Sequence, residues 1–327
     1  MNVHNSKYEV VFNRGEVPYE DDENINGLTL TIAIVPKVIN IPYFNAVEEG
    51  ALEAGKDLDV NVIYRGPTLA DPNMQIAIIR ELINEKVDVI AVSANDPEKV
   101  TPILIEAKRK GIHVITWDSD ALPEARSFFI NMVDPETLGR HLMDMLAWNT
   151  GEEGEFAILT GALSAANLNE WIKWIQIQRE EYYPNMTLVD IVANDDNPQK
   201  AYTKAIELLE THPNLKGIIG NSSVGPPAAA QAVKELGKAG EVAVVGLSPP
   251  NPMNKYLKEG SAQIVTLWSP KKLGYLTVAL AKNAAKKVLP YDHQHVESVG
   301  KIRLIGDVVI MDEPIDFTKE NVDEYDF

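Results

Sequence analysis

Apolar runs and amphipathic stretches alternate along most of the chain. Runs such as "LTLTIAIV" at 28–35 and "VDVIAVS" at 87–93 are typical of buried strands, whereas "NAVEEGALEAGKDL" at 45–58 has helical spacing. The first part of the sequence therefore predicts strands and helices in strict alternation: strands 28–35, 60–66, 87–93 and 113–118, and helices 45–58, 74–86 and 97–111. This order implies right-handed crossovers and a parallel sheet covered by helices on both faces.

The same alternation begins again after residue 139. It predicts a second set of strands and helices: strands 155–161, 188–194, 215–223 and 242–248, and helices 169–183, 198–212 and 226–238. The segment 261–288 adds one strand and one helix, which is too little for a third domain but suits completion of an earlier sheet. A chain that returns to its first lobe crosses between the lobes more than once, and such crossings form a hinge.

We therefore predict an α/β protein with two doubly wound, Rossmann-like lobes joined by a multi-strand hinge. The first lobe is expected at 28–132 plus 269–296, and the second at 133–268 plus 297–327. Residues 1–27 are polar and acidic and are interpreted as a leader or solvated tether. The length of 327 residues, 45% of them hydrophobic, is sufficient for two such lobes.

The net charge and the absence of cysteine limit the kinds of partner and chemistry that we expect for this protein. The formal net charge of -18, from 48 acidic and 30 basic residues, disfavours nucleic acids and anionic membrane surfaces as partners. The absence of cysteine excludes thiol catalysis, disulfides and thiolate metal sites. The sequence predicts neither a membrane span nor a signal peptide of its own. The expected partner is a small molecule or another protein.

Catalytic and cofactor motifs are sparse. Neither GxGxxG nor GxxxxGK[ST] follows a predicted strand, and the nucleophile motif GxSxG is missing. We interpret "DHQHVE" at 292–297 as an exposed linker rather than a metal site, and "ANDDNPQK" at 193–200 as the start of a helix. The sequence thus predicts no metal and no cofactor, and nothing in it favours an enzyme.

Ligands of open parallel sheets bind beyond the carboxyl ends of the strands, so the residues that follow each apolar run are the candidate site. In the first lobe these are Lys37, Tyr43, Phe44, Asn95, Asp96, Trp117, Asp118, Asp120 and Asn131. In the second lobe they are Asn167, Asn169, Trp171, Ser222, Ser223, Leu247 and Trp268. Carboxylates and amides can pair with vicinal hydroxyls while aromatic rings cover an apolar C–H face, which indicates a polyhydroxylated ligand.

Several candidates have a structural alternative. Asp96, followed by Pro97, has the position of a helix N-cap. Asn131 can be a turn residue, and Trp171 can pack in the core. Asp120 either contacts the ligand or supports Asp118. For Asp118 itself a function is favoured, because a carboxylate that follows a buried strand is costly unless it is paired.

Beyond these patterns, an ordered set of motifs carries a family resemblance: "VPK" (35–37), "TWDSD" (116–120), "NLNEW" (167–171), "PPAAAQA" (226–232), "VVGLSPPN" (244–251) and "LWSP" (267–270). From about residue 29 onward the chain resembles the sugar-type (type I) periplasmic binding proteins of ABC importers, in the branch of rhamnose-binding proteins and autoinducer-2 receptors. The resemblance implies three hinge crossings, ligand capture by lobe closure and delivery to a membrane permease. It also implies that Lys37 and Asp118 touch ligand hydroxyls, with Tyr43, Phe44 and Trp268 as aromatic walls.

Within this branch the resemblance favours a rhamnose-like deoxyhexose as ligand. The autoinducer-2 receptors have Asp-Gln where this chain has Asn167 and Leu168, and Pro-Asp-Ala where it has Asn221, Ser222 and Ser223. The rhamnose type has Asn and a hydroxyl pair at these places, although Leu168 departs from both patterns. An autoinducer-2 receptor is the alternative, and a sugar-processing enzyme comes after it.

The resemblance also sets expectations for partners and location. It implies a monomer in the periplasm or on the cell surface, with an export or lipoprotein segment outside this sequence. A sugar-responsive repressor would need a basic helix-turn-helix before the first lobe, and the acidic leader does not supply one.

Overall fold

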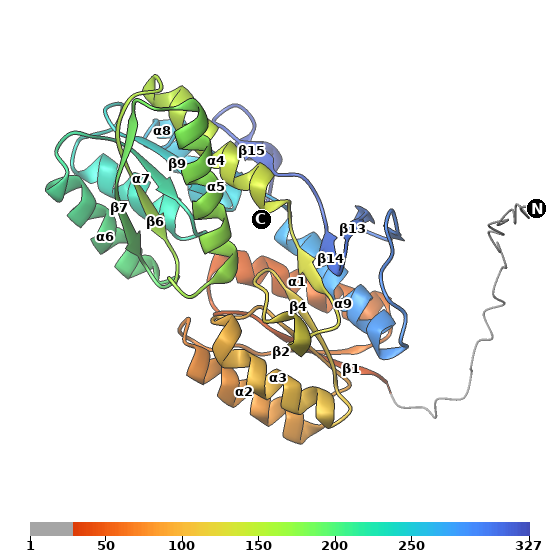
Figure 1. Ribbon diagram of the computed structural model, residues 1–327. Coiled ribbons are helices and arrows are strands. Elements are labelled where there is room, and N and C mark those ends of the chain that lie inside the picture. The colour runs from red at the N-terminus through yellow and green to blue at the C-terminus, as the bar shows by residue number, and fades with distance from the viewer. Residues whose placement is uncertain (1–28) are drawn as a thin grey trace, which may run out of the picture.

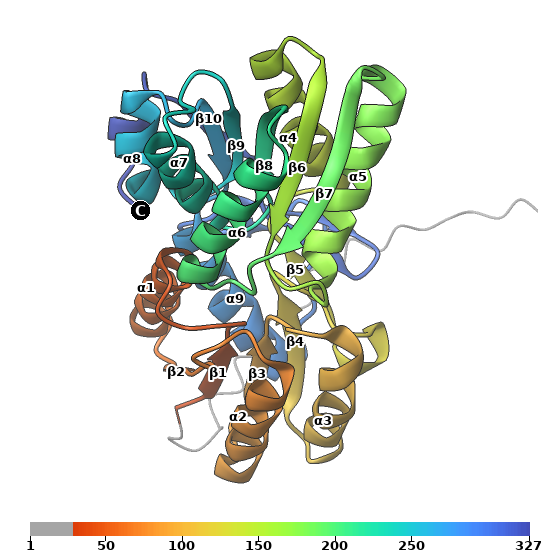
Figure 2. The same ribbon diagram turned by 90° about the vertical axis from the view of Figure 1, so that its left-hand side faces the viewer.

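The computed structural model describes residues 29–327, so the predicted leader at 1–27 lies outside the described residues. These residues form two α/β lobes, each built on its own sheet (Figure 1). The second view separates them clearly, with β1–β4 and their helices below and β6–β9 above (Figure 2). The predicted fold class is confirmed.

The first lobe contains a seven-stranded sheet in the order β13-β14-β5-β4-β3-β1-β2. Its strands are β1 (Thr31–Val35), β2 (Asn61–Tyr64), β3 (Val89–Val92), β4 (His113–Trp117), β5 (Phe129–Asn131), β13 (Arg303–Ile305) and β14 (Val308–Ile310). All pairs are parallel except β13 with β14. The helices are α1 (Pro42–Asp57), α2 (Pro72–Glu85), α3 (Pro97–Arg109) and α9 (Pro270–Ala285). Helices α1 and α9 pack together on the sheet, as do α2 and α3.

The second lobe contains a six-stranded sheet in the order β15-β10-β9-β8-β6-β7. Its strands are β6 (Gly154–Thr160), β7 (Met186–Ala193), β8 (Leu215–Gly220), β9 (Ala243–Leu247), β10 (Ile264–Leu267) and the antiparallel β15 (Ile315–Phe317). The helices are α4 (Pro135–Thr150), α5 (Ala166–Tyr182), α6 (Pro198–Thr211), α7 (Gly225–Glu235) and α8 (Pro250–Glu259). A two-stranded ribbon, β11 (His295–Val296) with β12 (Gly300–Lys301), lies outside both sheets.

Three segments cross between the lobes: β5 to α4, β10 to α9, and β14 to β15. The third crossing differs from the sequence prediction, which assigned 297–327 to the second lobe. Because β14 pairs with β5 and β13 pairs with β14, the strands at 303–310 extend the first sheet. Only β15 joins the second sheet, so the chain crosses between residues 310 and 315.

Burial explains why the predicted strands form. Every residue of β3 is fully buried, as expected for a parallel sheet covered on both faces. On one face, α1 and α9 approach so closely that a Cβ at Gly50 would lie 1.9 Å from the Lys271 carbonyl oxygen. This contact fixes the start of α1, where Tyr43 and Phe44 lie, relative to the segment that follows Trp268.

Within residues 29–327, no helix combines the length and the apolar character needed to cross a bilayer.

Candidate functional site

A cavity lies where the carboxyl ends of the two sheets face each other. Ten of the sixteen predicted site residues line it: Lys37, Tyr43, Phe44, Asp118, Asn167, Trp171, Ser222, Ser223, Leu247 and Trp268. Ile41, Leu168, Asp196 and Leu267 complete the lining. Both lobes contribute, because a parallel sheet presents all its strand ends at one edge and the hinge turns the two edges toward each other.

Asp118 is a buried carboxylate of the first lobe with several polar neighbours. It follows β4 in a left-handed backbone conformation, with φ of 60°, which Asp tolerates better than most side chains. Its Oδ2 accepts a hydrogen bond from Ser93 Oγ at 2.5 Å and lies 3.5 Å from Lys37 Nζ. Its Oδ1 accepts from the Tyr43 hydroxyl at 3.1 Å. Burial of this carboxylate is thus compensated by three donors.

The Tyr43 hydroxyl connects Asp118 to the end of β10. Trp268 Nε1 donates a hydrogen bond to the Tyr43 oxygen at 3.1 Å, and Tyr43 in turn donates to Asp118. Burial is the main cause that raises the pKa of the Tyr43 phenol well above its usual range, and the negative charge of Asp118 raises it further. Tyr43 therefore stays protonated and donates to Asp118 across the physiological pH range.

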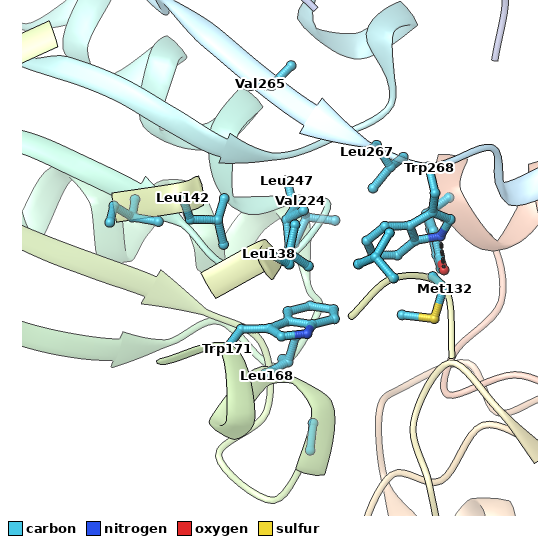
Figure 3. Close-up of a cluster of buried hydrophobic side chains, with 14 of the residues drawn as sticks. Met132, Leu138, Leu142, Leu168, Trp171, Val224, Leu247, Val265, Leu267 and Trp268 are labelled. Carbon is cyan, nitrogen blue, oxygen red and sulfur yellow. Dashed lines mark hydrogen bonds between the residues drawn. The ribbon is translucent and has the colours of Figure 1, made fainter. Parts of the chain in front are cut away.

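Aromatic and aliphatic side chains form the apolar part of the cavity wall (Figure 3). Trp171 and Leu168 come from α5, and Trp268 comes from the end of β10. The two indole rings lie 5.9 Å apart between centroids. Tyr43 meets Trp268 edge to face, a stable geometry for neighbouring rings. These rings offer flat apolar surface beside the polar groups of the first lobe.

The polar wall of the second lobe consists of amides and hydroxyls. Asn194 Nδ2 donates to Ser222 Oγ at 3.0 Å, which orients the hydroxyl that lines the cavity. Asn221 donates to the backbone oxygen of Leu168, so it supports the start of α5. Asn167 lines the cavity, and its Oδ1 has no hydrogen-bond partner among the described residues.

Asp196 is a cavity residue that the sequence interpretation missed. The prediction that 193–200 starts a helix is confirmed, since Asn197 caps α6 through the Lys200 amide. Asp196, one residue earlier, is nevertheless buried in the cavity wall. The signal was its place just after β7, the same rule that found the other candidates. Burial is the main cause that raises the pKa of the Asp196 carboxyl; Asp118 and Asp195 add to the rise and Lys37 opposes it.

Six predicted residues do not line the cavity, and four of them have structural roles. Asp96 caps α3 by accepting from the amides of Glu98 and Lys99, so the alternative interpretation of this residue is confirmed. Trp117 is fully buried and donates to the Ala91 carbonyl. Asp120 forms an ion pair with buried Arg126. Asn131 is the last residue of β5 rather than a turn residue, and its side-chain oxygen accepts from the Met132 amide.

Of the other two residues, Asn95 lies in the loop between β3 and α3, and Asn169 lies in the first turn of α5. Asn169 donates to the Leu163 carbonyl within the β6–α5 connection. Asn95 donates to the Lys37 carbonyl at 2.9 Å, and its own carbonyl accepts a hydrogen bond from Ser164 Oγ of the second lobe at 2.8 Å. Asn95 therefore supports Lys37 and joins the two lobes, so the structure represents a closed arrangement of the cleft.

Among residues 29–327, no three His, Asp or Glu side chains are arranged to hold a metal ion. The chemistry available in the cavity is hydrogen bonding, charge and aromatic contact.

Comparison with known proteins identifies the family to which this architecture belongs. The family model described as periplasmic binding protein domain matches residues 32–287. The chain is 26% identical to the D-allose-binding periplasmic protein of Escherichia coli, over 80% of this chain and 86% of that protein. It is 29% identical to an ABC transporter solute-binding protein from Clostridium phytofermentas with bound L-rhamnose, with a TM-score of 0.86 and coverage of 91% and 98%.

LsrB from Clostridium saccharobutylicum in complex with AI-2 has the same fold, with 24% identity, a TM-score of 0.87 and coverage of 91% of this chain and 100% of that chain. The resemblance seen in the sequence motifs is thereby confirmed. The chain belongs to the periplasmic binding protein family, whose members here are sugar-binding proteins of ABC importers rather than enzymes, and it has the two-lobed type I fold.

Proposed function

We propose that this protein captures a small sugar, with a rhamnose-like deoxyhexose favoured, by closing its lobes and delivering the sugar to an ABC permease. The observation that carries the proposal is the buried Asp118 carboxylate, held by Lys37, Ser93 and Tyr43 at the inter-lobe cavity. A charged acceptor and a charged donor side by side can bind two neighbouring hydroxyls of a sugar ring.

The apolar wall supports a deoxyhexose in particular. Leu168, Leu247 and Leu267 line the cavity together with the indoles of Trp171 and Trp268. A 6-deoxy sugar presents a methyl group, and burial of that group against leucine side chains is favourable, whereas a 6-hydroxyl there would lose its hydrogen bonds to water. The 29% identity with a protein that holds L-rhamnose points the same way.

Autoinducer-2 is the second candidate ligand. The fold shared with LsrB favours it, but at 24% identity that likeness concerns architecture. The cavity has Asn167, Leu168, Ser222 and Ser223 at positions where the sequence motifs of such receptors differ. We place it below rhamnose for this reason.

Partners and location follow from the same proposal. We infer a monomer that works in the periplasm or on the outer cell surface and meets a membrane permease when its lobes are closed. Closure is selected because the ligand bridges groups on both lobes, which the open state cannot offer together.

A thermal-shift screen tests the proposed function. The panel contains L-rhamnose, D-arabinose, D-ribose, D-allose and autoinducer-2. A ligand present at about 100 times its Kd should stabilise the folded protein by about 2.7 kcal/mol, so L-rhamnose is expected to raise Tm most. Stabilisation by autoinducer-2 alone would support the second candidate. No rise with any compound would overturn the proposal, as would conversion of the sugar instead of its recovery unchanged.

A further inference from the structure

Asp196 brings a second carboxylate to the cavity, from the lobe opposite Lys37 and Asp118. The residue is 6% exposed, and its Oδ2 has no hydrogen-bond partner within residues 29–327. A buried carboxylate oxygen without a donor is costly, and native structures contain few of them. An unsatisfied oxygen on a cavity wall is explained if a ligand supplies the donor.

The loop around Asp196 is built to hold this carboxylate in place. Asp195 and Asp196 have consecutive left-handed conformations, with φ of 52° and 53°. Asn194, which is fully buried, accepts from the Asp196 amide at 2.9 Å and donates to Ser222 Oγ. A Cβ at Gly161 would lie 2.7 Å from Asp196 Oδ1, so glycine there leaves room for the carboxylate. Strained backbone of this kind persists where its surroundings enforce it, often at ligand sites.

The charges in the cavity determine which ligands fit. Asp118 and Asp196 face a single ammonium group, that of Lys37, and no other cationic side chain of the described residues lines the cavity. Lys37 lies 3.5 Å from Asp118, and Asp196 Oδ2 has no hydrogen-bond partner in the part of the chain that the structure describes. Asn167 Oδ1 is a second acceptor on the same wall that has no donor among the described residues. This wall therefore suits hydroxyl donors and repels a ligand that carries negative charge.

We propose that Asp196 is a specificity-determining residue that accepts a hydrogen bond from a sugar hydroxyl and selects uncharged sugars over those with a carboxylate or phosphate. The inference rests on the proposed sugar-binding function and assigns part of the recognition to the second lobe. The raised pKa of Asp196, caused mainly by burial, agrees with a carboxyl group whose donor is supplied by the ligand.

A purely structural role for Asp196 would leave a different signature. If its carboxylate stabilised the fold, Asp196→Asn would lower the Tm of the ligand-free protein and leave affinity unchanged. If it serves the ligand, the same change removes an uncompensated buried charge, so the ligand-free Tm should stay equal or rise while affinity falls. The matched control is Asp195→Asn, because Asp195 is exposed, pairs with Lys200 and does not line the cavity.

The experiment combines titration calorimetry with thermal unfolding of the full chain. The best neutral sugar of the screen, D-galacturonate and D-glucuronate are each titrated into the wild type, Asp196→Asn and Asp195→Asn. We expect the neutral sugar to bind about 10- to 100-fold more weakly to Asp196→Asn and within about twofold to Asp195→Asn. Neither uronate should bind the wild type.

The outcomes separate this inference from the function on which it rests. Unchanged affinity in Asp196→Asn overturns the inference alone, as does a uronate that binds the wild type as tightly as the neutral sugar. A wild type that binds no sugar overturns both the proposed function and the inference. A fall in the ligand-free Tm of Asp196→Asn with normal affinity assigns Asp196 to folding and also overturns the inference.

Discussion

At the scale of one residue, Asp118 shows how a buried carboxylate can be held in place and still accept a hydrogen bond from a ligand. A carboxylate has about four lone-pair sites. Oδ2 faces both Ser93 and Lys37, whereas among residues 29–327 Oδ1 accepts a hydrogen bond only from Tyr43. Oδ1 is thus the oxygen with remaining capacity for a ligand hydroxyl. Its three neighbours hold the carboxylate in position without saturating it.

Tyr43→Phe tests the connection between Asp118 and Trp268. Loss of the hydroxyl leaves the buried Trp268 N–H without an acceptor, so we expect unfolding free energy to fall by about 1–3 kcal/mol and sugar affinity to fall too. Urea unfolding and calorimetry measure the two effects. Tyr64→Phe, which loses a hydrogen bond to the Phe44 carbonyl outside the cavity, should reduce stability but spare affinity. Unchanged stability and affinity in Tyr43→Phe would refute the connection.

The raised pKa of Asp196 has a consequence for stability. The folded state holds this proton more tightly than the unfolded state, whose pKa is near 3.8. Protonation of Asp196 therefore stabilises the folded state fully below pH 3.8. This stabilisation is lost as pH rises through the raised pKa that Asp196 has in the folded state. Asp196→Asn has no such titration, so the Tm of the ligand-free variant minus that of the wild type should grow as pH rises above 3.8 and through the raised folded pKa of Asp196. A difference that is constant or shrinks would contradict the assignment. Asp195→Asn keeps the Asp196 carboxyl and removes only the last of the causes that raise its pKa, so this variant should show much less growth.

The strand-end rule found most of the cavity from sequence, and its errors have a common cause. Asp96 and Asp118 both follow buried strands of the same sheet. Asp96 has φ of -153° and turns its carboxylate back to cap α3, whereas Asp118 has φ of 60° and faces the cavity. The direction of the Asp118 carboxylate depends on its neighbours Ser93 and Tyr43, which are distant from Asp118 in sequence. The sequence pattern therefore predicted which residues follow the strands, but it could not predict the direction in which their side chains point.

At the scale of elements, most long helices and buried strands were predicted, but the 16-residue helix α4 and the short elements were not. Asp71 and Asp96 precede prolines and start α2 and α3 where such caps are expected. In contrast, β13, β14 and β15 have three residues each, too few to show a period. Helix α8 was also not predicted; it is only 10 residues long and contains two prolines.

Asp96→Ala separates the cap from a ligand role. Loss of the two amide contacts at the start of α3 should reduce unfolding free energy by about 1 kcal/mol, while sugar affinity stays the same. Chemical denaturation and calorimetry are the measurements. Asp71→Ala removes the equivalent cap of α2, so it should also reduce unfolding free energy and leave sugar affinity the same. A large loss of affinity with unchanged stability would show that Asp96 belongs to the binding site.

At the scale of the whole molecule, three crossings hold two lobes around one cavity. Arg126 ties two of the relevant segments together, because it pairs with Asp120 after β4 and with Asp307 before β14. The C-terminal crossing is thus anchored near the strand that carries Asp118. No local sequence pattern indicates the ion pair between Arg126 and Asp307, because these residues are 181 positions apart.

Ser164→Ala tests whether the closed arrangement depends on a direct contact between lobes. The Ser164 hydroxyl donates to the Asn95 carbonyl across the cleft. Its loss is worth about 0.5–1.5 kcal/mol, so we expect the sugar to dissociate about 2- to 10-fold faster. Stopped-flow tryptophan fluorescence can follow release, because Trp171 and Trp268 line the cavity. Ser127→Ala, at an exposed position of the first lobe, is the control. Equal release rates in both variants would refute the role of this contact.

The central claim is that a sugar binds between the lobes against Asp118. Titration calorimetry of the best sugar from the screen into the wild type and Asp118→Ala tests it most directly. We expect one sugar per wild-type chain and binding about 10- to 100-fold weaker in the variant, because a charged hydrogen-bond partner is lost. An unchanged Kd in Asp118→Ala would contradict the claim.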